Sequence, residues 1–292
     1  METSQANTVS VAPQPERSQI TTRDGLALPV YRWRAAGLRC ATVALVHGLA
    51  EHAQRYATLA QTLNANGIEL VAVDLRGHGN APGRRAWIER FDDYLLDAQA
   101  LVAEAARNDG PLFLMGHSMG GAIAALYAIE RAPQGSVPLA GLLLSSAALA
   151  PGRDVPRWML ALSQKISRVW PRFPAMKIDA ALLSREQRVV DANRSDPLVH
   201  HGAIPARTGA ELLLAMQRIE QGRARLRTPL LIWHGTADKL TEPEGSRDFG
   251  AHAGSSDKTL TFYDGSYHET MNDLDRERVI DALTAWILKR SE

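Results

Sequence analysis

The stretch Leu114-Met115-Gly116-His117-Ser118-Met119-Gly120-Gly121 decides how this chain folds. It contains the pattern G-x-S-x-G, with the apolar residues 112–115 before it and an alanine-rich segment after it. This context predicts a buried strand, a very tight turn and a helix, with Ser118 at the turn. The glycines let neighbouring backbone approach without a Cβ clash, and the helix dipole favours negative charge near the hydroxyl. We therefore expect Ser118 to be a nucleophile.

The segments around this turn predict alternating strands and helices. Strands are expected at 26–33, 41–47, 68–73, 112–115, 142–145, 230–233 and 260–262, and helices at 54–66, 91–107 and 119–130. Strands that are apolar on both faces and alternate with helices are typical of a mostly parallel sheet with helices on both faces. The predicted fold class is therefore α/β, specifically the α/β-hydrolase fold.

Composition narrows the classes of function. The chain has 292 residues, and 33 Lys and Arg nearly cancel 32 Asp and Glu, which argues against a nucleic-acid partner. Cys40 is the only cysteine, so a disulfide framework and a cysteine metal site are excluded, and a reducing cytoplasm fits. Residues 1–17 are polar and predict a flexible tail without a secretory signal. No apolar run approaches the roughly 20 residues of a membrane helix.

One long segment breaks the alternation of strands and helices. Residues 150–205 contain six prolines and no clear buried strand, which predicts a helical cap inserted into a core formed by 18–149 and 206–292. An apolar, helically spaced cluster in this segment is predicted to bind the substrate; its members are Trp158, Met159, Leu162 and Trp170. The alternative is that these side chains only pack the cap onto the core.

A serine hydroxyl is a weak nucleophile at neutral pH, so it needs a base and a group that orients the base. In this fold the acid and then the histidine follow the serine along the chain. Asp238 ends the segment 230–238, a predicted strand that opens into a loop. His268 lies in the loop 264–269, after the next predicted strand. We expect His268 to accept the proton of Ser118 and Asp238 to orient and stabilise the imidazole.

Other residues compete for these roles. Asp264 is an alternative acid, but it lies close to His268 in sequence and is expected to cap its own turn. His234 precedes the acid and is expected to pack beside the end of its strand. His200 and His201 have no third ligand at metal spacing, so they predict cap surface or pocket lining and no metal site.

Acyl transfer also needs two backbone N–H donors for the oxyanion. One comes from the residue after the nucleophile, which is Met119, and the other from an earlier loop. That loop follows the predicted strand 41–46, so we assign the second donor to Leu49. Gly48 permits the bend that points this N–H inward.

Five motifs in order resemble those of the monoacylglycerol lipases and related lysophospholipases. They are HGLAEHAQRY at 47–56, DLRGHG at 74–79, GHSMGG at 116–121, HGTAD at 234–238 and YHE at 267–269. The resemblance extends from about Gly25 to Leu288. It implies an α/β-hydrolase core with a helical cap, no cofactor, and hydrolysis of the ester of a single-chain glycerolipid. Carried over by position, Ser118, Asp238 and His268 form the triad, and Leu49 and Met119 the oxyanion donors.

The leading hypothesis is that monoacylglycerols are cleaved to fatty acid and glycerol through an acyl-enzyme on Ser118. A lysophospholipase or a general carboxylesterase would use the same triad, and a non-catalytic ligand receptor is the alternative from another class. The expected partner is a lipid ester, with peripheral contact between the cap and a membrane or micelle surface; the sequence indicates no oligomeric state. Within the motif at 47–56, we interpret Glu51, His52, Arg55 and Tyr56 as support for the oxyanion loop.

Overall fold

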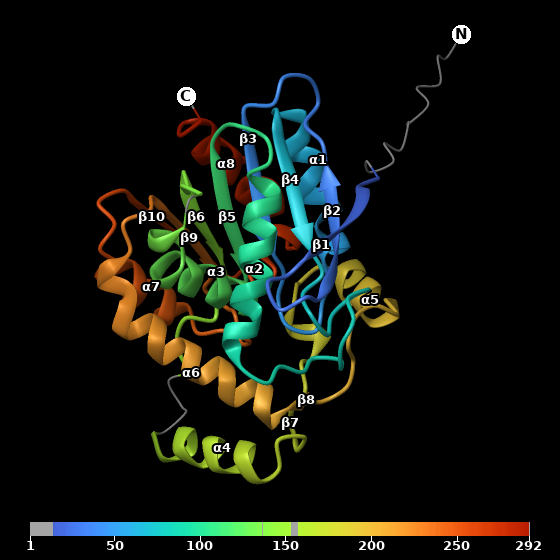
Figure 1. The fold of residues 1–292 in the computed structure, drawn as a ribbon, viewed down its shortest axis with the longest axis vertical. Helices are drawn as coiled ribbons and strands as arrows, with labels where there is room; N and C mark the ends of the chain where they lie inside the picture. Colours follow the sequence, from blue (N-terminus) through green and yellow to red (C-terminus); the bar gives the residue numbers. More distant parts are fainter. Residues whose placement is uncertain (1–13, 136, 153–156, 292) are drawn as a thin grey trace.

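The computed structural model describes residues 14–135, 137–152 and 157–291, and its centre is an eight-stranded sheet (Figure 1). The strand order is β1-β2-β4-β3-β5-β6-β9-β10. The strands are β1 Glu16–Thr21, β2 Ala27–Trp33, β3 Ala41–Val46, β4 Ile68–Val73, β5 Leu112–His117, β6 Gly141–Ser145, β9 Leu230–Gly235 and β10 Lys258–Tyr263. All neighbours from β4 to β10 are parallel, while β2 is antiparallel to both β1 and β4. The predicted, mostly parallel sheet is confirmed.

Helices cover both faces of this sheet. They are α1 Ala57–Ala65, α2 Phe91–Ala105, α3 Met119–Glu130, α6 Ala206–Gly222, α7 Pro243–His252 and α8 Arg276–Leu288. Side chains alternate along each strand, so Ala44 and Val46 of β3 pack with α2 and α3, whereas Val43 and Leu45 pack with α1 and α8. Because both faces are covered, every residue of the central strands β3, β4, β5, β6 and β9 is buried, and their largely apolar sequences are why these strands could be predicted.

The strand β1 was not predicted, and it begins at Glu16, inside the predicted tail 1–17. Of its six residues only Ile20 is buried, so its sequence has no apolar alternation from which a strand could be recognised. Its pairing with β2 across the turn at Gly25, where φ is +87°, holds it on the sheet edge. The first thirteen residues of that tail lie outside the described residues.

The long insertion between β6 and β9 contains its own elements. Residues 150–205, called the inserted segment below, include the helices α4 Arg157–Val169 and α5 Gln187–Ser195, the 3-10 turn Ala180–Leu182, and the strands β7 Pro174–Met176 and β8 Ile204–Pro205. β7 and β8 pair with each other in a small antiparallel sheet that the sequence did not predict. The helix α6 packs on both α4 and α3, so it separates α4 from the core (Figure 1).

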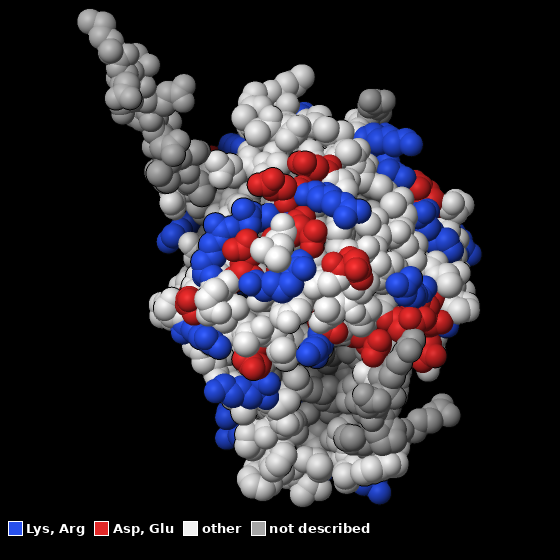
Figure 2. All heavy atoms as spheres, turned by 180° about the vertical axis from the view of Figure 1, so that it is seen from behind, with Lys and Arg blue, Asp and Glu red and all other residues white. Residues whose placement is uncertain are grey.

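The surface carries charges of both signs in close proximity. Figure 2 shows Lys and Arg interspersed with Asp and Glu on the face opposite to that of Figure 1, as expected for a formal net charge of +1. In the described part of the chain, no helix combines the length and the apolar character needed to cross a bilayer.

Candidate active site

Ser118 occupies the turn between β5 and α3, where the backbone is strained. Its φ is +54° and its ψ is −122°, a conformation that residues with a side chain rarely adopt. A Cβ at position 116 would collide with the carbonyl oxygen of Gly120, and a Cβ at position 120 would collide with that of Val46. Both glycines are therefore required sterically, and the turn has the geometry that the sequence pattern predicts.

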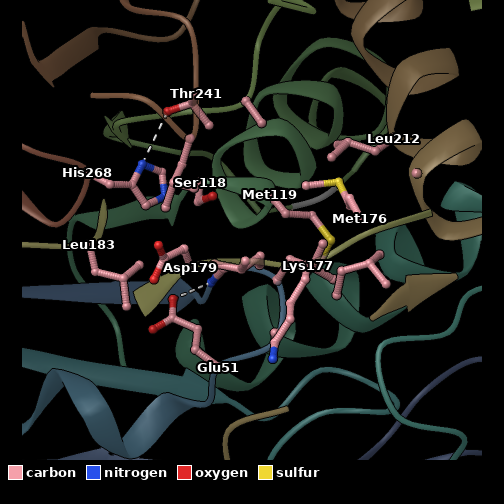
Figure 3. A pocket seen from close by; sticks show the side chains of 18 of the residues that line it. Glu51, Ser118, Met119, Met176, Lys177, Asp179, Leu183, Leu212, Thr241 and His268 are labelled. Atoms are coloured by element: carbon pink, nitrogen blue, oxygen red, sulfur yellow. Dashed lines mark hydrogen bonds between the residues drawn. The ribbon is translucent and has the colours of Figure 1, made fainter. Parts of the chain in front are cut away.

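The loops after β9 and β10 bring the predicted acid and base together. The two strands are parallel neighbours, so their carboxyl ends meet at one edge of the sheet. Nδ1–H of His268 donates to Oδ2 of Asp238 over 2.7 Å, and both side chains are buried. Ser118 lines the same pocket as this pair and lies beside His268 (Figure 3).

The surroundings tune this pair for proton transfer. Burial lowers the pKa of His268, but the charge of Asp238 and its hydrogen bond outweigh burial, so the pKa is raised above 6.5. For Asp238, burial raises the pKa, but the charge of His268 and the hydrogen bonds from His234 and His268 hold it well below its usual range. Asp238 is thus ionised at neutral pH and favours the imidazolium that forms when His268 accepts a proton.

Two further side chains bind Asp238, and the sequence analysis assigned neither to the site. Nε2 of His234 lies 3.0 Å from Oδ2 of Asp238, and Oγ1 of Thr241 lies 2.8 Å from the same oxygen. Oδ1 accepts from the backbone N–H groups of Leu240 and Thr241, at 2.8 and 3.1 Å. His234 is buried at the end of its strand, as expected, and it also contacts the acid, which the sequence analysis did not predict. The signal in the sequence was the spacing of four residues between His234 and Asp238, because a turn at the end of β9 brings residues at that spacing together.

The loop after β3 lies against the nucleophile. A Cβ on Gly48 would be 3.2 Å from Cβ of Ser118, and Leu49 and Met119 line the pocket together with Ser118. The N–H of Gly48 donates to Oε1 of Glu51 over 2.6 Å, and the carbonyl oxygen of Gly48, in the peptide directly before Leu49, lies 2.7 Å from Nδ1 of His47. The two expected oxyanion donors, the N–H groups of Leu49 and Met119, therefore both belong to backbone that borders Ser118.

A buried network of charged groups lies beneath this loop. Glu51 accepts from the hydroxyl of Tyr56 and from Nη1 of Arg55, each at 2.7 Å, and Arg55 also binds both carboxylate oxygens of Glu269 at 2.6 and 2.9 Å. Burial opposes ionisation of Glu51, but the charge of Arg55, with smaller contributions from His117 and His47, lowers its pKa to about 2. His52 instead lies 2.9 Å from a carboxylate oxygen of the inserted segment. These contacts tie the oxyanion loop to the loop that carries His268.

The pocket above these residues has a volume of about 1300 Å³ and is lined by both apolar and polar side chains. The apolar lining includes Ile166, Met176, Ile178, Leu212, Leu213 and Met216. The polar lining includes Glu51, Arg55, His117, Asn193, His200 and Glu269. In Figure 3, Leu212 and Met176 lie beyond Met119, on the side away from His268. The serine therefore opens into a space that suits a molecule with an apolar and a polar part.

The residues of the inserted segment that were predicted to bind substrate are Trp158, Met159, Leu162 and Trp170. The structure places three of them elsewhere: Trp158, Leu162 and Trp170 are 67%, 43% and 61% exposed and do not line the pocket. Successive helical residues are rotated by about 100°, so the stripe of Trp158 and Leu162 points outward while Ser163 and Ile166 face the pocket. The side chain of Met159 lies outside the described residues.

The remaining candidates take other positions. Asp264 accepts a hydrogen bond from Oγ1 of Thr236 over 3.1 Å, which links its turn to the loop after β9. His200 and His201 both line the pocket. In residues 14–135, 137–152 and 157–291, no group of three or more His, Cys, Asp or Glu is arranged to hold a metal ion.

Ser118 lies at a strained turn between a strand and a helix, and the loops after β9 and β10 bring a histidine–carboxylate pair into the same pocket. This arrangement defines the class of the α/β-hydrolases. A model of the family described as serine aminopeptidase, S33, matches residues 38–275 of the chain. The chain therefore belongs to this family of α/β-hydrolases.

Individual relatives agree with this assignment. The monoacylglycerol lipase of Mycolicibacterium smegmatis is 36% identical over 249 residues, which are 84% of this chain and 87% of that protein. Human monoglyceride lipase is 31% identical over 295 residues, or 99% and 96% of the two chains. The crystal structure of Paleococcus ferrophilus monoacylglycerol lipase matches with a TM-score of 0.78 and 32% identity, over 89% and 99% of the chains. The predicted resemblance to the monoacylglycerol lipases is confirmed.

Proposed function

We propose that this protein hydrolyses the ester bond of monoacylglycerols to a fatty acid and glycerol, with Ser118, His268 and Asp238 as the catalytic triad. One observation carries the proposal: the elbow serine, beside a buried histidine–carboxylate pair, opens into a pocket lined by both apolar and polar side chains. The names of the relatives in M. smegmatis and human, monoacylglycerol and monoglyceride lipase, support the same substrate class.

The reaction follows from the positions of these groups. His268 accepts the proton of the Ser118 hydroxyl while its oxygen attacks the ester carbonyl, and the N–H groups of Leu49 and Met119 bind the resulting oxyanion. As the ester C–O bond breaks, His268 returns the proton to the glycerol oxygen. Water, activated in turn by His268, attacks the acyl-enzyme and releases the fatty acid. Asp238 keeps the imidazole in the required tautomer throughout.

The two kinds of lining residue suit the two parts of the substrate. We place the acyl chain against the apolar side chains of Leu212, Leu213 and Met216, because burying hydrocarbon there is favourable by about 25 cal/mol for each Å² removed from water. The glycerol hydroxyls then face Glu51, Arg55 and Glu269, where carboxylate and guanidinium groups can accept and donate hydrogen bonds.

The inserted segment, residues 150–205, acts in this proposal as a cap that contacts a membrane or micelle surface peripherally. Its outward side carries the exposed apolar side chains of Trp158, Leu162, Val169 and Trp170. Tryptophan is well suited to the boundary between lipid and water because it is apolar with one polar N–H group. A substrate that is itself a lipid would be drawn from such a surface. The cytoplasmic location stays a prediction.

A substrate panel tests the proposal. Purified protein would be assayed with 1- and 2-monooleoylglycerol, dioleoylglycerol, lysophosphatidylcholine, p-nitrophenyl butyrate and an aminoacyl p-nitroanilide. We expect the highest kcat/KM among the lipids for monooleoylglycerol. Faster turnover of lysophosphatidylcholine would instead make the protein a lysophospholipase, and turnover restricted to the butyrate would make it a carboxylesterase. Tight lipid binding without any turnover would support the receptor alternative.

A further inference from the structure

The carboxylate of Asp238 is held between two histidines. His268 approaches Oδ2 from the loop after β10, and His234 approaches the same oxygen from the end of β9, at 2.7 and 3.0 Å. The side chain of His234 is completely buried, as is that of Asp238. Packing alone does not explain a buried imidazole that contacts the acid directly. An apolar side chain could fill the same space without the free-energy cost of removing polar nitrogens from water.

The tautomer of His234 is set from the other side of its ring. Oγ of Ser246, on α7, lies 2.8 Å from Nδ1 of His234. Ionised Asp238 can only accept, so a neutral His234 must carry its proton on Nε2 and accept at Nδ1 from the Ser246 hydroxyl. The result is a continuous chain of hydrogen bonds from Ser246 through His234 and Asp238 to His268.

Thr241 is the other side chain that can donate to Oδ2 of Asp238, but its hydroxyl lies near a second acceptor. The hydroxyl of Thr241 has a single proton, and Oγ1 lies 2.8 Å from Oδ2 of Asp238 and 3.0 Å from the carbonyl oxygen of Ser146. Nε2 of His234 is also 3.2 Å from this hydroxyl, so Thr241 completes the contacts around Oδ2. Besides His268, His234 is thus the side chain that can direct an N–H at Asp238.

We propose that His234, held in one tautomer by Ser246, is a positioning residue that fixes the orientation of Asp238 toward His268 and withdraws part of its negative charge. This role rests on the triad proposed above, and it acts through Asp238 without contact with the substrate. The backbone N–H groups of Leu240 and Thr241 hold Oδ1, whereas His234 holds the oxygen that His268 uses.

Loss of the hydrogen bond from His234 to Asp238 should change the pH dependence of the reaction, whereas loss of packing alone should not. With one donor fewer, Asp238 keeps more negative charge for His268, which raises the pKa of His268 further and moves the acid limb of kcat/KM to higher pH. Other groups also face His268: the carboxylates of Glu51 and Glu269 raise its pKa, and the ring of His117 lies 4.7 Å away, centroid to centroid. These groups stay in place when His234 is changed, so the shift reports the bond to Asp238.

Three variants test the proposal with p-nitrophenyl butyrate as the substrate. His234→Leu removes the donor, His234→Gln keeps an amide N–H at a similar reach, and Ser246→Ala releases the tautomer. We expect His234→Leu to lower kcat about 10- to 100-fold, as for one hydrogen bond to a charged group, with KM unchanged and the acid limb moved upward. Ser246→Ala should produce the same changes to a smaller extent, and His234→Gln should restore most of kcat.

Thr284→Val is the matched control, because it removes a buried side-chain hydrogen bond on α8, to the carbonyl oxygen of Ile280. It should leave the pH profile unchanged. Wild-type kcat and an unshifted acid limb in a folded His234→Leu would overturn the proposal; if His234→Leu does not fold, the same two results in Ser246→Ala do so. A wild-type enzyme that hydrolyses the butyrate but no monoacylglycerol would contradict the substrate assignment alone.

Discussion

The floor of the pocket, formed by Ser118, Asp238 and His268, and the inserted segment differ in how their side chains are held. On the floor, Asp238 accepts hydrogen bonds at both oxygens and His268 is buried against it. In the inserted segment, Trp158 and Trp170 are mostly exposed, and α4 packs on α6 away from the sheet. The floor thus depends on the distances between a few atoms, whereas the outward side of the inserted segment presents exposed apolar side chains. The same substitution strategy should therefore have very different effects in the two regions.

The largest effect is expected at Ser118. Replacement by alanine removes the attacking oxygen and should lower kcat for p-nitrophenyl butyrate about 10⁴- to 10⁶-fold, as when a triad serine is lost. The fold should be retained, because the Ser118 side chain points into the pocket; circular dichroism and the thermal midpoint check this. Turnover of the ester by Ser118→Ala at the wild-type rate would contradict the claim that the floor is more sensitive to substitution than the inserted segment.

Asp238→Asn tests the floor through its pH dependence. The pKa of His268 is raised above 6.5, and the neutral imidazole is the base, so wild-type kcat/KM should fall as the pH drops through that raised value. An amide in place of the carboxylate removes this cause of the shift and holds the wrong tautomer, so kcat should fall about 10⁴-fold. The acid limb of the residual activity should move to lower pH. An unchanged limb would show that Asp238 does not govern His268.

The boundary between the two regions can be probed at Gly209, which lines the pocket on α6. Apart from its chain neighbours and the helix's own backbone, no described atom lies within 4 Å of a Cβ built there, its φ is not positive, and it is the fourth residue of α6. A glycine inside a helix costs about 1 kcal/mol relative to alanine, so Gly209→Ala should raise the stability by up to that amount. Gly209→Phe should fill part of the pocket and reduce kcat/KM for monooleoylglycerol about tenfold relative to monobutyrylglycerol.

The control for this change is Gln217→Phe, on an exposed position of the same helix. It should leave the ratio of long-chain to short-chain activity as in the wild type. Equal ratios in Gly209→Phe and Gln217→Phe would mean that the acyl chain does not pass along α6.

The smallest effect is expected on the outward face of the inserted segment. Trp158→Ser and Trp170→Ser each remove an exposed indole, so binding to phosphatidylcholine vesicles in a co-sedimentation assay should weaken about three- to tenfold, as for partial burial of one large side chain. Hydrolysis of dissolved p-nitrophenyl butyrate should not change. A loss of butyrate hydrolysis in either variant would show instead that these side chains support the site.

The contrast between the two regions also explains what the sequence could predict. The glycines two residues before and two residues after Ser118 are required sterically, so a short pattern identifies the turn wherever a strand precedes it and a helix follows. The outward direction of Trp158 could not be predicted, because apolar spacing shows that a helix has an apolar stripe but not which surface it meets. β1 was missed because Ile20 is its single buried residue, and the contact of His234 because it depends on the turn after β9.

The central claim, that Ser118 forms the acyl-enzyme, is tested most directly by labelling the wild-type protein with a fluorophosphonate and locating the adduct by peptide mass spectrometry. We predict one adduct per chain, on Ser118, and loss of monooleoylglycerol hydrolysis in proportion to the labelled fraction. An adduct on another residue, or full hydrolysis by completely labelled protein, would contradict the account.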